Sequence, residues 1–255
     1  MKNNFSPILS VQNLSVTFPK KGSFFIKKQA SDQVLSDVNF ELYKGKITAL
    51  VGESGSGKTT IGNTIVGLVG SFTGDFQFEG NAYNPLDMSH LRTEIQYIFQ
   101  DSLSALNPRM KAGQILNEIL LIHHSNENVD SILEQVDLQG EISGKYPHEL
   151  SGGQRQRVNI ARALAVNPQV LVCDEVVSAL DVSIQAKILN LITRLVRERN
   201  LAILFITHDL NVVKAFAESI IVLSKGVIVE KGNALQIMES PEHSYTKTLI
   251  AAMYS

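Results

Sequence analysis

The chain has 255 residues, 44% of them hydrophobic, and its formal net charge is -2. A chain of this size can bury one large core, or a core with a modest inserted lobe. So small a net charge gives no overall attraction for DNA or RNA, and no basic cluster stands out, so we expect no nucleic acid among its partners.

The single cysteine, Cys173, lies in an apolar run, which excludes an internal disulfide framework and a cysteine-rich metal cluster. A reducing, cytosolic compartment fits this best. Residues 1–5 carry no apolar signal-peptide region, and no apolar run approaches the roughly 18 residues that a membrane span needs. The sequence therefore predicts that any membrane association comes through partners.

Alternating apolar and polar residues predict half-buried strands at residues 8–13 and 34–42. Between them, residues 19–28 carry two lysine pairs around an apolar centre, which indicates a solvated hairpin tip. The alternative is a foot that touches a membrane surface or a membrane partner. Phe18, just before this segment, is either a core residue or a platform on which an adenine ring stacks.

A glycine-rich loop at residues 52–59 joins a strand-like apolar run at 47–51 to a segment with helical periodicity. Its glycines permit positive φ and let the backbone approach a ligand, so successive N–H groups and the helix start can point at an anion. Lys58 would lie against the β- and γ-phosphates of a nucleotide, and the Thr59 hydroxyl would complete a Mg²⁺ shell. The alternative is an ordinary turn with a surface lysine. The residues expected to line this cradle are Gly52, Ser54, Gly55, Ser56, Gly57, Lys58, Thr59 and Thr60.

Two further short strands are predicted at residues 74–79 and 95–99, and Gln100 ends the second of them. From about residue 112 to residue 140 the apolar period becomes helical, with a break at residues 126–128. This pattern predicts an inserted helical lobe.

Residues 150–154, Leu-Ser-Gly-Gly-Gln, open another helical pattern, which Asn167-Pro168 ends. A serine and two glycines before a helix have the geometry of an anion site, although by itself such a segment is only an N-cap. Together with the first loop it suggests a second phosphate-contacting element. One chain cannot easily bring both elements to the same phosphate.

The apolar run at residues 170–173 ends in Asp174 and Glu175, which strand alternation sends to opposite sides. Asp174 can hold Mg²⁺ through water, which leaves Glu175 to orient and deprotonate an attacking water. A charged pair that merely caps a strand is the weaker alternative, because two carboxylates after a buried strand are costly without a cation. His208 follows the next buried strand, 202–207, where it is either structural or hydrogen-bonds a γ-phosphate oxygen.

Residues 178–181 turn the chain into a helix predicted at residues 182–199. A hairpin is predicted at residues 220–223 and 227–231, closed by residues 224–226, and two short amphipathic segments end the chain. No internal repeat is visible, so we expect one nucleotide-binding module.

In this order the motifs resemble those of ATP-binding cassette (ABC) ATPases, over nearly the whole chain. A Walker A loop alone would admit kinases, GTPases and helicases, whereas the ordered Leu-Ser-Gly-Gly-Gln is far more specific. The matching motifs are Walker A at residues 52–59, the Q-loop at Gln100, the signature at residues 150–154, Walker B with its glutamate at residues 170–175, the D-loop at residues 178–181 and the switch histidine at His208.

The resemblance implies an α/β fold: a P-loop NTPase (RecA-like) core with an antiparallel β subdomain and an inserted α-helical subdomain. One ABC ATPase domain would span residues 1–255. Its core with the β subdomain would take residues 1–100 and 158–240, its helical subdomain residues 101–157, and its C-terminal tail residues 241–255.

The resemblance also implies ATP and Mg²⁺ as cofactors and two cassettes that face head to tail. The signature of one cassette would then close over the ATP that the Walker motifs of the other hold. The implied catalytic residues are Lys58, Gln100, Glu175 and His208, and the implied Mg²⁺ ligands are Thr59, Gln100 and Asp174. The implied nucleotide contacts are Phe18, the loop residues named above, Ser151, Gly152, Gly153, Gln154 and Asp181.

A narrower resemblance, to the ATPase subunits of bacterial oligopeptide, dipeptide and nickel importers, rests on residues 99–109, 173–181 and 241–246. Val176-Val177 replaces the usual Pro-Thr, and Ser244 replaces the proline of the family's His-Pro-Tyr-Thr. These departures weaken the substrate assignment more than the mechanism. The resemblance implies a peripheral subunit at the cytoplasmic face of the cell membrane that powers uptake of peptides or of nickel and other metal complexes.

The implied partners are a second ABC ATPase subunit, either a paralogue or an identical chain, and two transmembrane permease subunits. An extracellular or periplasmic solute-binding protein would be an indirect partner. The ATPase of an exporter is the alternative, and a soluble ABC ATPase outside transport is a more distant one. A DNA-repair ATPase would carry a long coiled-coil or zinc-bearing insertion, and a ribosome-associated relative would hold two cassettes in one chain.

Overall fold

The structure is a computed structural model, and it describes residues 6–19 and 31–253. The chain divides into two compact units. Unit 1 comprises the residues up to His90 and those from Ala202 onward, and unit 2 comprises Leu91–Leu201. The predicted tip at residues 19–28 lies outside the described residues except for Pro19.

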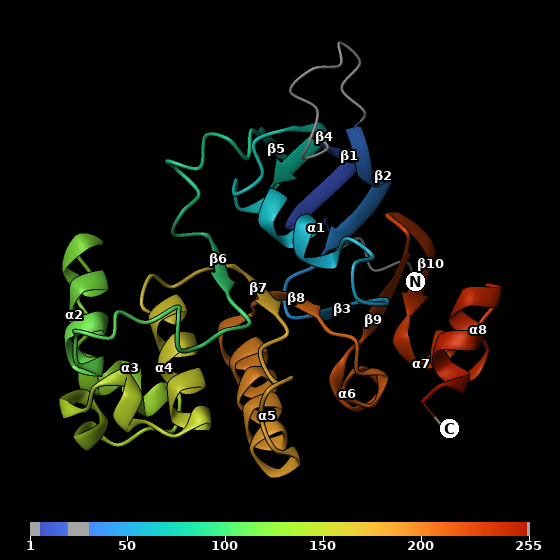
Figure 1. Ribbon diagram of the computed structural model, residues 1–255. Coiled ribbons are helices and arrows are strands. Elements are labelled where there is room, and N and C mark those ends of the chain that lie inside the picture. The colour runs from blue at the N-terminus through green and yellow to red at the C-terminus, as the bar shows by residue number, and fades with distance from the viewer. Residues whose placement is uncertain (1–5, 20–30, 254–255) are drawn as a thin grey trace. The chain divides into compact units, whose positions relative to one another are not determined.

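Unit 1 contains an antiparallel sheet with the strand order β2-β1-β4-β5 (Figure 1). Its strands are β1 (Leu9–Pro19), β2 (Ser31–Leu42), β4 (Phe72–Phe78) and β5 (Asn81–Tyr83). The expected first strand ended at Asn13, where β1 in fact continues past an irregularity. Asn13 has a φ of 51°, and the pairing register with β2 shifts between Val11 and Leu14. A bulge of this kind interrupts the two-residue alternation without ending the strand.

Unit 1 also contains four strands in the order β10-β9-β3-β8. The strands β3 (Ile47–Val51), β8 (Ala202–Ile206) and β9 (Ser219–Ser224) are parallel, and β10 (Val227–Asn233) pairs antiparallel to β9. Every residue of β3 and β8 is buried, as expected of parallel strands covered on both faces. The predicted hairpin is confirmed, and Lys225 and Gly226 close it with φ values of 47° and 80°.

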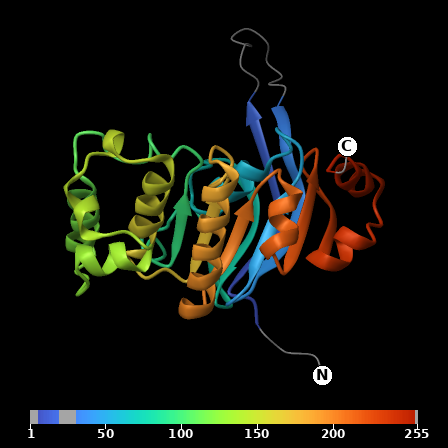
Figure 2. The ribbon, with the colours of Figure 1, turned by 90° about the horizontal axis from the view of Figure 1, so that it is seen from below.

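The helices of unit 1 are α1 (Lys58–Ile65), α6 (Leu210–Phe216), α7 (Ala234–Glu239) and α8 (Ser244–Ala251). The two last helices are the amphipathic segments expected at the end of the chain. Figure 2 shows them next to each other, beyond β10. Both pack onto β10, and Ile237 and Ile250 join a core cluster with Ala49 and Val51 of β3.

Unit 2 pairs β6 (Ile95–Ile98) in parallel with β7 (Val170–Asp174). Its helices are α2 (Ala112–Ile122), α3 (Val129–Gln135), α4 (Gly152–Leu164) and α5 (Val182–Arg199), with 3₁₀ turns η1 (Gly140–Gly144) and η2 (Pro147–Glu149). The break expected at residues 126–128 falls between α2 and α3, where Asn128 caps α3. The helix predicted at residues 182–199 is α5.

Parallel strands with helices, a separate antiparallel sheet and a helix-rich segment confirm the predicted fold class. The predicted subdomain boundaries remain a prediction. The two compact units divide the chain differently, since unit 2 contains β6, β7 and α5 in addition to the helices of residues 101–157. Among the described residues, no helix combines the length and the apolarity needed to cross a membrane.

Candidate functional site

The phosphate loop, residues 52–59, follows the buried strand β3 in unit 1. Its three glycines have positive φ, as predicted: 155° at Gly52, 79° at Gly55 and 107° at Gly57. A Cβ on Gly52 would lie 2.1 Å from the carbonyl oxygen of Leu223, and one on Gly57 would lie 2.6 Å from Leu35 Cδ2. The Leu223 carbonyl therefore leaves no room for a side chain at position 52, whereas a methyl at position 57 would push the end of the Leu35 side chain aside; the positive φ favours glycine at both positions.

Lys58 is the first residue of α1, and its side chain folds back over the loop. Its Nζ donates hydrogen bonds to the carbonyl oxygens of Gly52 at 2.8 Å and Glu53 at 2.9 Å. Lys58 is only 5% exposed. Gly57 occupies the N-cap position of α1 but makes no side-chain hydrogen bond there. The N–H donors in the first turn of the helix therefore receive no capping side chain. A buried ammonium and an uncapped helix start together favour an anionic ligand.

The remaining loop residues suit a polyphosphate. Ser54, Gly55 and Thr59 are exposed and Thr60 is half-buried, and a Cβ on Gly55 would meet no atom within 4 Å. The Ser56 hydroxyl is buried and has no hydrogen-bond partner in the described part of the chain. The loop thus has an exposed face and one buried hydroxyl without a partner, and both features are compatible with a phosphate ligand.

Two contacts from distant parts of unit 1 support the loop, and the sequence indicated neither. Gly226 N–H in the β9–β10 turn donates to Ser56 O at 3.0 Å. Glu53 N–H donates to the Tyr245 hydroxyl at 3.0 Å. Tyr245 lies in the segment that resembles the importer motif, but nothing in that motif shows that its tyrosine reaches a loop 192 residues away.

In unit 2, Asp174 and Glu175 have different partners, in line with the expectation that they do different work. Asp174 is 5% exposed, and its Oδ2 accepts a hydrogen bond from the Tyr97 hydroxyl at 2.7 Å. Burial, and next the negative charge of Asp174, raises the pKa of Tyr97, which keeps the hydroxyl protonated as a donor. Glu175 has a φ of 48°, and its Oε2 accepts from the Gln100 amide at 2.9 Å. The structure therefore brings together Gln100 and Glu175, two of the predicted catalytic residues. It also shows that Tyr97, which the sequence did not indicate, is a partner of Asp174.

The signature segment caps its own helix. Ser151 Oγ accepts from Gln154 N–H at 3.3 Å, and Gln154 Oε1 accepts from Ser151 N–H at 3.0 Å. This reciprocal pair is a capping box at the start of α4. Arg155 Nη1 donates to Leu150 O at 2.6 Å, which ties the segment to the helix that it opens.

Asp181 caps α5, accepting hydrogen bonds from Ile184 N–H at 3.0 Å and from the Ser183 hydroxyl at 2.8 Å. The Ile184 N–H, and next the Ser183 hydroxyl, lowers the pKa of the Asp181 carboxyl. Asp181 is thus a fixed carboxylate at the end of the predicted D-loop.

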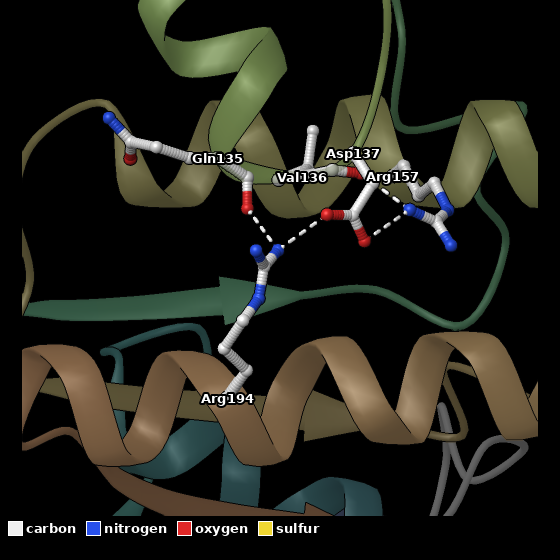
Figure 3. Close-up of polar contacts among 5 residues, drawn as sticks. All are labelled: Gln135, Val136, Asp137, Arg157 and Arg194. Atoms are coloured by element: carbon white, nitrogen blue, oxygen red, sulfur yellow. Dashed lines mark hydrogen bonds and ion pairs between the residues drawn. The ribbon is translucent and has the colours of Figure 1, made fainter.

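An ionic bridge in unit 2 connects the helix that follows the signature to the helix that follows the D-loop (Figure 3). Asp137 Oδ2 lies 2.9 Å from Arg157 Nη1 on α4, and its Oδ1 lies 2.8 Å from Arg194 Nη2 on α5. The same arginines donate to backbone carbonyls, Arg157 to Val136 O at 2.7 Å and Arg194 to Gln135 O at 2.9 Å. We call Asp137, Arg157 and Arg194 the Asp137 bridge; the sequence did not indicate it.

Two predicted residues of unit 1 lie at exposed positions. Phe18, on β1, is 41% exposed, which excludes its alternative role as a core residue and leaves the stacking role a prediction. His208 is exposed between β8 and α6, next to Asp209, which caps α6 through Asn211 N–H at 2.8 Å. A γ-phosphate contact of His208 also remains a prediction.

The predicted site residues divide between the two units. Unit 1 holds Phe18, Gly52, Ser54, Gly55, Ser56, Gly57, Lys58, Thr59, Thr60 and His208, and unit 2 holds Gln100, Ser151, Gly152, Gly153, Gln154, Asp174, Glu175 and Asp181. The structure assembles the phosphate loop in the first unit and the Gln100–Glu175 and Tyr97–Asp174 pairs in the second. A joint site that draws on Lys58 and the two carboxylates remains a prediction.

A cavity of about 640 Å³ in unit 1 lies apart from the phosphate loop. Its lining includes Thr48, near the beginning of β3, whereas the loop follows the end of that strand. Charged lining groups are engaged locally: Lys231 Nζ donates to Asn39 O at 2.8 Å, and Glu218 Oε2 accepts from Ile47 N–H at 2.7 Å. The candidate nucleotide site therefore lies in a different part of unit 1 from this cavity.

Curated relatives include the glutathione import ATP-binding protein GsiA of Pectobacterium atrosepticum, which is 44% identical over 97% of this chain. The protein of that name from Salmonella typhimurium is 42% identical over the same share. In each case the match covers 41% of the relative, so the chain spans about two fifths of the length of these relatives.

Solved structures agree on the fold. The dimeric ATP-binding cassette MJ0796, in a post-hydrolysis state with ADP and Pi, is 29% identical, with a TM-score of 0.74 over 89% of this chain and 98% of that one. The cbiO1 protein from Clostridium perfringens, part of the ABC transporter complex cbiONQ, has a TM-score of 0.78 over 92% of this chain and 91% of its own. At 24% identity, cbiO1 supports the fold alone.

The family model described as ABC transporter matches residues 35–178, which include the phosphate loop, Gln100, the signature and both carboxylates. Because this match covers more than half of the sequence, the chain belongs to the ABC transporter family.

Proposed function

We propose that the chain is the ATP-hydrolysing subunit of an ABC importer that powers uptake of peptides or of nickel and other metal complexes through partner permeases. The observation that carries this proposal is the phosphate loop, with the Lys58 ammonium over it and an uncapped helix start behind it. The relatives are named as import proteins, which favours an importer over the alternative, an exporter. Glutathione is a tripeptide, which favours a peptide-like cargo.

Nucleotide binding would use the N–H groups of residues 55–59 and the ammonium of Lys58. ATP would place its β- and γ-phosphates against Lys58 Nζ, which its hydrogen bonds to the Gly52 and Glu53 carbonyls hold over the loop. When bound, Mg²⁺ would neutralise phosphate charge. We expect the Thr59 hydroxyl and the Asp174 carboxylate to hold it, since Mg²⁺ takes one or two protein oxygens and keeps several waters. The described residues contain no group of three or more His, Cys, Asp or Glu that could hold a metal ion.

Glu175 would orient the attacking water and take its proton. The Gln100 amide, which donates to Glu175 Oε2 at 2.9 Å, holds the carboxylate in one orientation. Gln100 lies two residues after the end of β6, and the helices of residues 101–157 follow it, so a change at Glu175 can pass to that segment through this hydrogen bond. We infer that this contact links the nucleotide to the permease.

A second cassette, identical or paralogous, would complete each site by placing Ser151 to Gln154 against the bound ATP. Two permease subunits and, indirectly, an extracellular or periplasmic solute-binding protein would be the other partners. The subunit would lie at the cytoplasmic face of the cell membrane. ATP contacts that exist only in the closed pair would drive closure, and hydrolysis would release it.

The test compares the purified chain with Glu175→Gln in ATP binding and in Mg²⁺-dependent phosphate release. Glutamine keeps an acceptor for the Gln100 amide and removes the base, so binding should persist while turnover falls by about 10²-fold or more. Glu198→Gln, an exposed change on α5, is the matched control. Unchanged turnover in Glu175→Gln would refute the assigned role. Copurification with membrane permeases would support transport, and copurification with ribosomes would contradict it.

A further inference from the structure

We propose that Tyr245 on α8 is a positioning residue for the phosphate loop, acting through its hydroxyl on the peptide between Gly52 and Glu53. The inference deepens the proposed function, because it rests on ATP binding at this loop. The Tyr245 hydroxyl accepts a hydrogen bond from Glu53 N–H at 3.0 Å. The two residues are 192 positions apart, so only the tertiary fold brings them together.

The peptide that Tyr245 contacts is held at both of its polar ends. Its carbonyl, Gly52 O, accepts from Lys58 Nζ at 2.8 Å, and its N–H, on Glu53, donates to Tyr245. A peptide next to glycine rotates easily, because no Cβ restricts it, and Gly52 already has a φ of 155°. Rotation of this peptide would break both hydrogen bonds. The tyrosine hydroxyl therefore helps to keep the Gly52 carbonyl directed at Lys58.

Separate contacts fix the position of Tyr245 itself. Glu230 Oε1 and Oε2 accept from Glu242 N–H at 2.9 Å and from His243 N–H at 3.1 Å, which holds the chain just before α8. Burial acts to raise the pKa of Glu230, but these two backbone donors help to outweigh it, and the pKa is lowered overall. His243 Nδ1 accepts from Tyr245 N–H at 3.1 Å and caps the helix.

The tyrosine ring is anchored by packing. Tyr245 and Leu249 of α8 pack against the cluster that contains Ala49 and Val51 of β3, the strand that leads into the loop. Ring and hydroxyl therefore connect α8 to the strand and to the loop that follows it. A hydroxyl held in this way restricts the loop before a nucleotide arrives, and such restriction lowers the entropy that binding must overcome.

The experiment compares the full chain with Tyr245→Phe, which removes the hydroxyl and keeps the ring. Tyr43→Phe is the matched control, since the Tyr43 hydroxyl bonds to Glu41 in the same unit without touching the loop. Measurements are the Kd for ATP by calorimetry, KM and kcat for hydrolysis, the melting temperature, and amide hydrogen exchange of peptides that contain Glu53. Loss of one neutral hydrogen bond at an exposed amide should raise the Kd and KM for ATP about two- to ten-fold in Tyr245→Phe. kcat should stay within two-fold, and Glu53 should exchange faster.

Wild-type affinity in Tyr245→Phe, with the wild-type chain binding ATP normally, would overturn the inference and leave the proposed function intact. Failure of the wild-type chain to bind ATP would instead refute the proposed function. Leu249→Ala separates the hydroxyl from the packing, because it weakens α8 without touching that group. If Leu249→Ala raises the Kd as much as Tyr245→Phe does, packing explains the effect and the hydroxyl has no positioning role.

Discussion

The phosphate loop and the signature segment look alike in sequence, since each is a glycine-bearing stretch that opens a helix, but their helix starts differ. At the phosphate loop the N-cap is Gly57, with a left-handed φ of 107° and no side-chain hydrogen bond. At the signature the N-cap is Ser151, which exchanges hydrogen bonds with Gln154. The first helix keeps its donors for a ligand, whereas the second satisfies part of its own donors.

The two segments share one feature: in each, a basic side chain folds back and donates hydrogen bonds to backbone carbonyls of the same segment. Lys58 bonds to Gly52 and Glu53, and Arg155 bonds to Leu150. The two segments are therefore alike in residue type but differ in the number of backbone N–H groups that are left for an anion. Under the proposed function, the phosphate loop binds ATP first, and the signature adds its contacts once a second cassette approaches.

The largest effect is expected where packing and backbone both require glycine. Gly57→Ala should lower the free energy of unfolding by about 3 kcal/mol, because the new methyl would meet Leu35 at 2.6 Å and alanine disfavours positive φ. Urea denaturation followed by circular dichroism measures it. Gly55→Ala is the control, since its φ is also positive but its Cβ meets open space. Equal losses in the two variants would show that the Leu35 contact is unimportant.

Removal of the loop's cation should affect ligand binding more than stability. In Lys58→Ala, we expect the Kd for ATP to rise about 10- to 100-fold, as for loss of a charge-assisted contact to phosphate. Lys214→Ala on α6 is the control, because this exposed lysine lies on a helix of the same unit away from the loop. Calorimetry provides both affinities. Near-normal affinity in Lys58→Ala would contradict the role of the loop as a phosphate cradle.

The Asp137 bridge should be the salt-sensitive counterpart of the neutral contact at Tyr245. Asp137→Asn should lower the free energy of unfolding by about 1 kcal/mol at low salt, because half-exposed ion pairs are weakened by solvent. The difference should shrink in 1 M NaCl, where the Debye length is about 3 Å. The control, Glu79→Gln, breaks the exposed Lys44–Glu79 pair and should cost less. A loss in Asp137→Asn that is unchanged by salt would argue against an ionic bridge.

The smallest effect is expected at the signature glycine that opens α4. Gly152→Ala should change the free energy of unfolding by less than about 0.5 kcal/mol, because the preference of a helix for alanine offsets a close contact with Leu180 Cδ2 at 3.3 Å. Gly153→Ala is the comparison, since its methyl would lie 2.7 Å from Ile184 Cγ2. If Gly152→Ala were as harmful as Gly57→Ala, the two helix starts would not differ in the way described.

Local features of the sequence predicted much of the fold and of the site. The phosphate loop, the capped start of α4 and the span of α5 each depend on residues only a few positions apart, so their patterns are visible in the chain. The predicted end of the first strand, Asn13, was wrong. Positive φ at this residue interrupts the alternation of apolar and polar residues, and the strand β1 continues beyond it.

Contacts between distant segments could not be predicted in this way. Tyr97 meets a carboxylate 77 positions away, and Asp137 meets Arg194 at a separation of 57. No spacing rule connects such pairs, because tertiary packing alone decides which side chains meet. The close packing of Gly52 against the Leu223 carbonyl could not be read from the sequence either, although the sequence indicated that this glycine permits positive φ.

The β9–β10 turn has a consequence for protein engineering. Hairpin turns on a surface usually accept inserted tags, but Gly226 in this one gives its N–H to Ser56 and takes one from Ser36, and a Cβ on it would lie 2.2 Å from Val34 O. An epitope placed between Lys225 and Gly226 would therefore disturb the back of the phosphate loop. The β4–β5 turn at Gly80, where a Cβ meets nothing within 4 Å, is the safer position for a label.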